Sequence, residues 1–211
     1  MNGDLPTASY RHDCRASAPN EIKLMDESNN LAGHLLIAMP AMADPNFAQT
    51  VTYICEHSDQ GALGLVINRP LDIDLGEVFA QLELKNCDKA MSGQPVLHGG
   101  PVNMERGFVI HETEESWENS MSINDSIQVT TSRDILIAMA NGHGPRRATV
   151  ALGYAGWGAG QLEHEILENS WLNTPANAQI IFDTPFADRW QQSAQLLGID
   201  LSMISPEAGH A

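Results

Sequence analysis

Basic residues are scarce in this sequence. Lys and Arg number 11 against 27 Asp and Glu, which gives a formal net charge of −16 at pH 7. Nucleic-acid affinity depends on Lys and Arg contacts to phosphates, and a field of this sign repels the phosphate backbone. We therefore expect no direct binding to nucleic acid. The tightest basic pair, Arg146-Arg147, is more typical of a solvated loop than of a binding surface.

Long apolar runs and a secretory leader are also missing. No stretch approaches the roughly 20 apolar residues that a membrane-spanning helix needs. Residues Met1 to Pro19 are polar, with charged side chains interspersed, which is unlike a signal peptide. The sequence thus predicts a cytoplasmic protein without membrane contact, and its 211 residues suffice for one large core.

Cysteine is sparse as well. Cys14, Cys55 and Cys87 are odd in number and widely spaced, which fits neither a disulfide framework nor a CxxC zinc site. We expect reduced thiols. The eight histidines follow no metal-ligand spacing such as HExxH, so no metal site is predicted. No cofactor fingerprint is present, and we expect no cofactor.

The chain divides into a polar arm at residues 1–30, expected to be flexible, and a folded domain at 31–211. Strand-like runs gather early, and helical segments enter singly between them. Among them, Thr50 to His57 predicts a strand, Leu71 to Leu84 an amphipathic helix and Gln179 to Phe182 a further strand. This order predicts one α+β domain, with a mixed, mostly antiparallel sheet or partly open barrel flanked by helices.

Four sequence blocks resemble the YqgE/AlgH family of bacterial proteins. They are Gly33 to Pro40 with Asp44 to Phe47, Glu56-His57 through Gly64 to Asn68, His98 to Val102, and Gly153 to Glu163. The similarity spans about Leu31 to Ala211. It implies a mixed α/β fold and offers no agreed catalytic set, although some family members carry the label of transcriptional regulators. Any such role in this acidic chain is expected to be indirect.

A glycine-rich segment follows the predicted strand Thr149 to Tyr154. Close-set glycines let backbone amides approach an anion, and a helix N-terminus after them favours negative charge. The pattern matches neither GxGxxG nor the P-loop, and Glu163, Glu165 and Glu168 would repel an anion. Tight turns and close packing are therefore the favoured interpretation, with a ligand loop as the alternative.

A second loop of this kind is His98-Gly99-Gly100-Pro101. We hypothesise that the two loops face each other across a cleft, although the sequence does not establish their proximity. The ligand would be a small anionic metabolite. The candidate binding residues are Asn68, His98, Gly99, Gly100, Tyr154, Gly156, Trp157, Gly158, Gly160 and Gln161.

Cys55 and His57 are the candidate catalytic residues. Two positions apart in a predicted strand, they should share a face, where an imidazolium would lower the pKa of the thiol. A small buried Cys with a His at the strand's exit is the favoured alternative, because cysteines in strands usually only pack.

Three classes of function remain open. The leading interpretation is a regulatory or ligand-binding protein, not an enzyme, that acts through a small anionic metabolite or a protein partner. The alternative is a thiol-dependent or hydrolytic enzyme using Cys55 and His57. The third is an interaction protein anchored by exposed Trp117, Trp157 or Trp171. The sequence does not determine the oligomeric state.

Overall fold

A computed structural model describes residues 30–85, 89–113 and 117–204 of the chain. The arm predicted at 1–30 therefore lies, apart from its last residue, outside the described residues. The strands are β1 (His34–Ala38), β2 (Val51–Ser58), β3 (Gly61–Val66), β4 (Pro70–Asp74), β5 (Pro95–His98), β6 (Val102–Glu112), β7 (Ser120–Ser122), β8 (Ile127–Thr130), β9 (Ala148–Gly158) and β10 (Trp171–Pro175). The helices are α1 (Leu75–Gln81), α2 (Lys89–Ser92), α3 (Arg133–Ala140), α4 (Gln161–Leu167), α5 (Ala178–Phe182) and α6 (Arg189–Gln195), followed by a 3-10 turn at Leu201–Met203.

The strands form one curled sheet in the order β10-β1-β2-β3-β9-β6-β8-β7. Strand β4 pairs with β5, and β5 runs parallel to β9; every other pairing within the described ranges is antiparallel. The α+β fold with a mostly antiparallel, partly open sheet is therefore confirmed.

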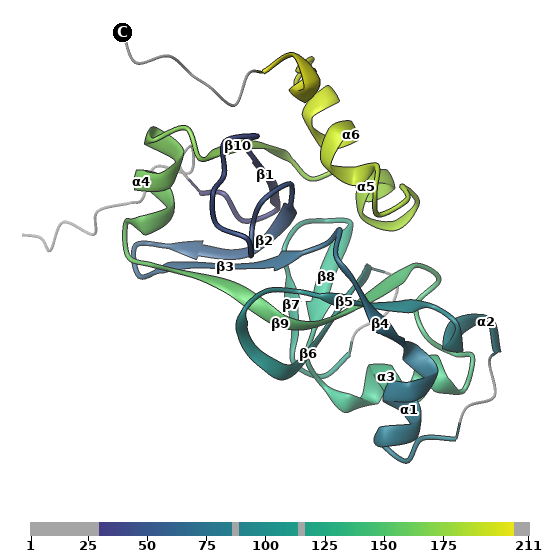
Figure 1. Cartoon of the computed structure of the whole chain (residues 1–211). Helices are drawn as coiled ribbons and strands as arrows, with labels where there is room; N and C mark the ends of the chain where they lie inside the picture. The colour runs from purple at the N-terminus through teal and green to yellow at the C-terminus, as the bar shows by residue number, and fades with distance from the viewer. Residues whose placement is uncertain (1–29, 86–88, 114–116, 205–211) are drawn as a thin grey trace, which may run out of the picture.

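Strand β9 joins the two halves of the sheet. Its first residues pair with β6, and its last residues, Ala155 to Gly158, pair with β3. Gly153 lies at the register shift of the β6-β9 pairing, just before the partner changes, and has a φ of 75°, a conformation that glycine adopts without steric cost. In Figure 1, β9 crosses the middle of the molecule, with α4, α5 and α6 on one side of it and α1, α2 and α3 on the other.

The predicted helix over Leu71 to Leu84 is only half right. Its first part, β4, alternates exposed acidic residues with partly buried Leu71 and Ile73, the period of a strand. Helix α1 begins after Asp74, whose carboxylate accepts from the Glu77 amide, while the Glu77 side chain accepts from the Asp74 amide. This reciprocal capping box fixes the start of the helix.

Two other expectations were wrong. The apolar run at 179–182 lies in helix α5, where the Asn177 side chain caps the first turn by accepting from the Gln179 amide. A run this short is too brief for its period to separate a buried helix from a strand. The glycine-rich segment after Tyr154 is not a loop, because β9 continues through it to Gly158.

Among the described residues, four hydrophobic clusters form the interior. The largest surrounds Tyr53 and Phe108 and includes Ile180 and Ile181 of α5. A second lies under α1 and α3, a third around Trp157 and Trp171 against α4, and a small fourth under α6. No helix in the described part of the chain is both long and apolar enough to cross a bilayer.

Candidate functional site

A large hollow lies between the helices α1 and α3 and the β6-β9 part of the sheet. Its volume is about 610 Å³. Helix α1 begins at the capping box of Asp74, and α3 begins just after β8. Both helices pack in one hydrophobic cluster with Val109 and Val150, so they lie over the same face of the sheet. We call this hollow the α1-α3 groove.

The walls of the α1-α3 groove are mainly apolar. Helix α1 and the residues around it contribute Ile73, Val78 and Leu82, α3 contributes Leu136, and the two strands contribute Met104, Phe108, Val109, Val150 and Leu152. Phe108, Val109 and Val150 are buried, whereas Met104 is 39% exposed. The polar lining residues are Gln81, Glu105, Thr130, Thr131, Ser132 and Arg133.

Arg133 ties the two helices together at one end of the α1-α3 groove. Its Nη2 donates a hydrogen bond to the carbonyl oxygen of Leu82, just after α1. Thr130 is already engaged, since its hydroxyl contacts His111 Nε2 at 2.8 Å and the Ser120 hydroxyl at 2.7 Å. Arg133 and Glu105 are thus the charged groups that a bound molecule would meet.

Cys55 and His57 do not share a face of β2. The register with β3 shifts between Ile54 and Glu56, so Cys55 is the extra residue of a β-bulge. Cys55 packs with Tyr53 in the largest cluster, whereas His57 reaches Glu163 of α4 on the other side. A bulge breaks the two-residue alternation on which the prediction depended.

The thiol of Cys55 is not poised for nucleophilic chemistry. It is 5% exposed and donates to the main-chain oxygen of Tyr53 at 3.6 Å. Burial, with a smaller contribution from the charge of Glu56, raises its pKa well above the ordinary value of 9.0. The reactive form of a cysteine is the thiolate, which this environment disfavours.

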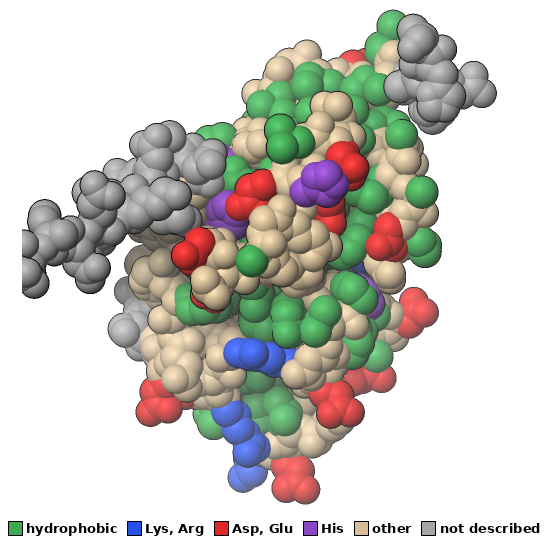
Figure 2. Space-filling model, turned by 90° about the vertical axis from the view of Figure 1, so that its left-hand side faces the viewer, with side chains coloured by type: hydrophobic (Ala, Val, Ile, Leu, Met, Phe, Trp, Pro, Cys, Tyr) green, Lys and Arg blue, Asp and Glu red, His purple; other side chains and the backbone are tan. Residues whose placement is uncertain are grey.

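His57 joins the N-terminal part of the domain to α4. Its Nδ1 accepts a hydrogen bond from the Leu31 amide at 3.0 Å, which assigns the ring proton of the neutral tautomer to Nε2. That nitrogen lies 3.0 Å from Oε1 of Glu163. Figure 2 faces the side of the molecule that carries α4, where histidines lie beside acidic side chains. The contacts of His57 are structural.

The two glycine segments meet in space. The Gly99 amide donates to the Leu152 carbonyl and the Gly99 carbonyl accepts from the Val66 amide, both at 2.8 Å. A Cβ on Gly100 would lie 2.2 Å from the backbone of Tyr154. Backbone thus fills the space where the sequence suggested a cleft, and these glycines permit close packing.

Four of the other candidate binding residues lie near β2, β3 and the end of β9. Tyr154, Gly156 and Trp157 line an open hollow of about 310 Å³ beside the β2-β3 hairpin. The Asn68 amide is used internally, because Oδ1 accepts from Val51 and Nδ2 donates to Gln49, each at 2.9 Å.

The remaining candidates lie at the start of α4 and at the end of β5. Gly160 is the N-cap of α4, and the Gln161 side chain accepts from the Gly158 amide at 3.0 Å. His98 ends β5, and its buried Nδ1 has no hydrogen-bond partner within the described ranges. Ligand binding by any of these candidate residues stays a prediction.

The tryptophans are not exposed anchors. Trp157 and Trp171 are 6% and 2% exposed, and Phe47 packs against both. Both indole N–H groups donate to Oε2 of Glu165, at 2.9 and 2.8 Å. Trp117 is partly buried against the cluster under α1 and α3. The prediction of exposed tryptophan anchors was therefore wrong, because these side chains belong to the core.

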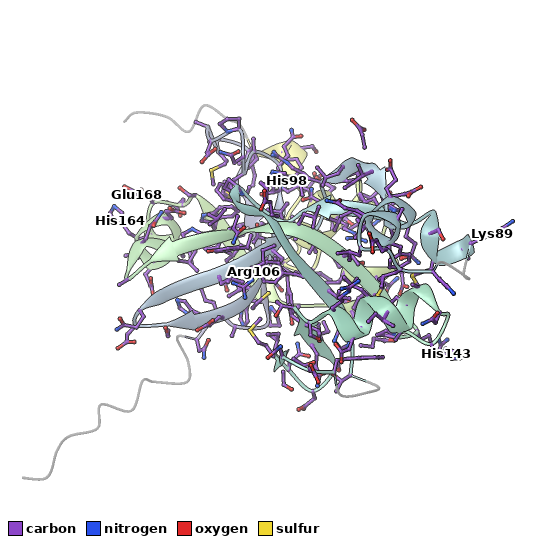
Figure 3. All side chains as sticks on the ribbon, turned by 90° about the horizontal axis from the view of Figure 1, so that it is seen from below. Lys89, His98, Arg106, His143, His164 and Glu168 are labelled. Carbon is purple, nitrogen blue, oxygen red and sulfur yellow. The ribbon has the colours of Figure 1, made fainter. Side chains whose placement is uncertain are left out.

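The histidines remain dispersed in the fold. His164 pairs with Glu168 at 3.3 Å on α4, while His143 lies far from both at the other end of the molecule (Figure 3). Within the described ranges, no group of three or more His, Cys, Asp or Glu side chains could hold a metal ion.

Sequence reasoning missed the α1-α3 groove. Its apolar side chains carry the same helical and strand periodicity as core residues, so no pattern separates a wall from a packed interior. The nearest signal was the helical spacing of Val78 and Leu82, which correctly predicted that this face of α1 is turned inward.

The groove and the curled sheet define an α+β domain with a pocket of ligand size. Over residues 35–202 the chain matches the family DUF179, described as AlgH-like, and it belongs to that family. It is 52% identical over 178 residues to a UPF0301 protein of Nitrosococcus oceani, covering 84% of this chain and 95% of that protein. A UPF0301 protein of Thioalkalivibrio sulfidiphilus is 54% identical over 187 residues, covering 89% of this chain and all of the relative.

Solved structures show the same fold. The solution structure of the AlgH protein from Pseudomonas aeruginosa is similar with a TM-score of 0.72 and 46% identity, covering 89% of this chain and 99% of that one. The crystal structure of protein DIP2367 from Corynebacterium diphtheriae matches with a TM-score of 0.62 at 22% identity, over 80% of this chain and 87% of that one. The second likeness concerns the fold alone.

Proposed function

We propose that the protein is a binding protein for a small molecule with an apolar body and a polar end, held in the α1-α3 groove. The observation that carries this proposal is the size and lining of the groove, about 610 Å³ with mainly apolar walls. Ligand sites in proteins typically measure about 300–1,000 Å³ and combine apolar walls with a few polar groups.

The apolar lining and Arg133 lie at different places in the groove and define the orientation of the ligand. Val109, Val150 and Leu152, which pack in the cluster under α1 and α3, line the sheet side and suit an apolar body. Arg133 is exposed at the start of α3 and suits a polar or anionic end. A regulatory role, including an indirect one in transcription, would then depend on whether the groove is occupied. The thiol-enzyme alternative finds no support in the buried Cys55.

The proposal is tested by binding of N-phenyl-1-naphthylamine, an apolar probe whose fluorescence rises in apolar surroundings. We expect saturable binding to the wild-type protein. Leu136→Trp places a larger side chain in the α1-α3 groove and should weaken probe binding by about tenfold, a change of about 1.4 kcal/mol.

The matched control is Ile137→Trp, at the neighbouring position of α3. Ile137 is 42% exposed and is not among the lining residues, so this variant should bind the probe as the wild type does. Equal affinity in all three proteins, or an equal loss in both variants, would contradict binding in the groove.

A further inference from the structure

Three arginines meet at a third pocket, in a chain whose net charge is −16. Arg146 and Arg147 precede β9, and Arg189 is the first residue of α6. The pocket measures about 220 Å³, and Asp183, Phe182 and Phe186 line it beside the three arginines. We call it the arginine pocket. Three arginines and one aspartate give its lining a formal charge of +2.

Arg189 is a buried cation without a carboxylate bound to it. It is 2% exposed, and it donates from Nε to the Thr184 carbonyl at 2.9 Å and from Nη1 to the Ile67 carbonyl. Its Nη2 has no hydrogen-bond partner among the described residues. Burying a guanidinium costs free energy unless another group compensates for the lost water. In agreement, burial lowers the pKa of Arg189 to about 10.

The other two arginines differ in how far they are neutralised. Arg147 forms ion pairs with Glu112 and Asp183. Arg146 is exposed and has neither a hydrogen bond nor a salt bridge to any described residue. Arg146 and Arg189 therefore leave the arginine pocket with positive charge that the protein itself does not pair.

Two phenylalanines complete the arginine pocket. The guanidinium of Arg189 lies 4.4 Å from the ring centre of Phe186, and that of Arg147 lies 5.3 Å from the ring centre of Phe182. Such stacking holds a guanidinium in place while its N–H groups remain available at the edge. The pocket thus combines fixed cationic groups with apolar ring surface.

We propose that the arginine pocket binds a small organic phosphate. Guanidinium groups match the geometry of phosphate oxygens, and Arg146 and Arg189, the two lining arginines without an ion pair, offer two positive charges to a dianion. The volume of about 220 Å³ leaves room for a small organic group against Phe182 and Phe186. The site is separate from the α1-α3 groove and shares no lining residue with it.

Phenyl phosphate is the probe that tests the site. Titration into ¹⁵N-labelled protein should move the Nε–H signal of Arg189 saturably, with a dissociation constant of about 1 mM or tighter. Benzoate at matched ionic strength carries one charge and should bind at least about tenfold more weakly. No saturable shift, or equal binding of benzoate, would overturn the proposal.

The matched variants are Arg146→Gln and Arg106→Gln, which remove one positive charge each. Arg106, labelled in Figure 3, is exposed, stacks over Phe108 on β6 and is not among the residues that line the arginine pocket. We expect Arg146→Gln to weaken phenyl phosphate binding by about tenfold and Arg106→Gln to leave it within twofold, because the pocket acts through direct contact. An equal loss in both variants would reduce the effect to net charge and refute the site.

Discussion

Cys55 and His57, two positions apart on β2, lie on opposite sides of the strand. The bulge at Cys55 turns the thiol into the cluster around Tyr53 and directs the imidazole to Glu163 of α4. A thiolate on one side of a sheet gains nothing from an imidazolium on the other. The two side chains therefore contact different parts of the core and do not contact each other.

Burial of the Cys55 thiol predicts a loss of stability at alkaline pH. Its pKa is raised in the folded state, so the thiol stays protonated there while the unfolded chain loses the proton above its ordinary pKa of 9.0. The stability that the buried neutral thiol contributes is fully present below pH 9.0. Above that pH the free energy of unfolding falls by about 1.4 kcal/mol per pH unit until the thiol ionises in the folded state as well. Urea unfolding from pH 8 to pH 10 measures this slope.

Two proteins are compared, and both carry Cys14→Ser and Cys87→Ser. The second also carries Cys55→Ala, so the two proteins differ by one thiol. In the Cys55→Ala protein the free energy of unfolding should fall less steeply with pH above pH 9.0, because the thiol is absent. This difference in slope does not depend on the stability that the cavity costs at pH 7. Tyr53 is buried with a raised pKa as well and adds its own slope above pH 10.0 in both proteins. Identical slopes would mean that Cys55 is not held as a buried neutral thiol.

Much of the fold followed from periodicity, and its failures have local causes. Strand β2 was predicted over Thr50 to His57, and the strand predicted over Thr149 to Tyr154 lies within β9, because apolar spacing and turn residues agree there. The helix at 71–84 was overextended because Leu71 also fits the helical stripe of the residues that follow, and pairing with β5, at Pro70 with Leu97 and at Asp74 with Pro95, makes the first part a strand. Pairing between distant segments is invisible in one sequence.

The candidate sites were harder to predict than the fold. The proximity of the two glycine segments was a correct hypothesis, but the sequence carries no sign that backbone fills the space between them. The arginine pocket combines Arg146 and Arg147 with Arg189, more than 40 positions away. No spacing rule connects these residues, because the packing of α6 against the sheet brings them together.

Replacing Glu165 by alanine should destabilise the protein far more than replacing Glu168, although both acids lie in or next to α4. Glu165→Ala leaves the indole N–H groups of Trp157 and Trp171 without their acceptor in the core, which should lower the free energy of unfolding by about 2–4 kcal/mol. Glu168→Ala removes only an exposed pair with His164 and should cost less than about 0.5 kcal/mol. Urea unfolding followed by circular dichroism measures both; equal costs would contradict an internal role for Glu165.

The glycines of the two segments should differ sharply in tolerance to alanine. A Cβ on Gly100 would lie 2.2 Å from the backbone of Tyr154, and Gly100 has a φ of 150°. Because β9 cannot withdraw without losing its pairing, Gly100→Ala should cost more than about 4 kcal/mol and reduce the yield of folded protein. Gly160 has a φ of 72° with no atom within 4 Å of an added Cβ. Gly160→Ala should therefore cost only about 1–2 kcal/mol, from backbone strain alone.

Thermal melts and soluble yield of the two variants give the comparison directly. A folded Gly100→Ala protein that melts like the wild type would mean that the segment at 98–101 is free to move away from β9. In that case the space between the glycine segments could open, and the cleft inferred from the sequence would regain its place as a ligand site. A melting temperature lowered far more for Gly100→Ala than for Gly160→Ala would instead establish that the first glycine is required by close backbone packing.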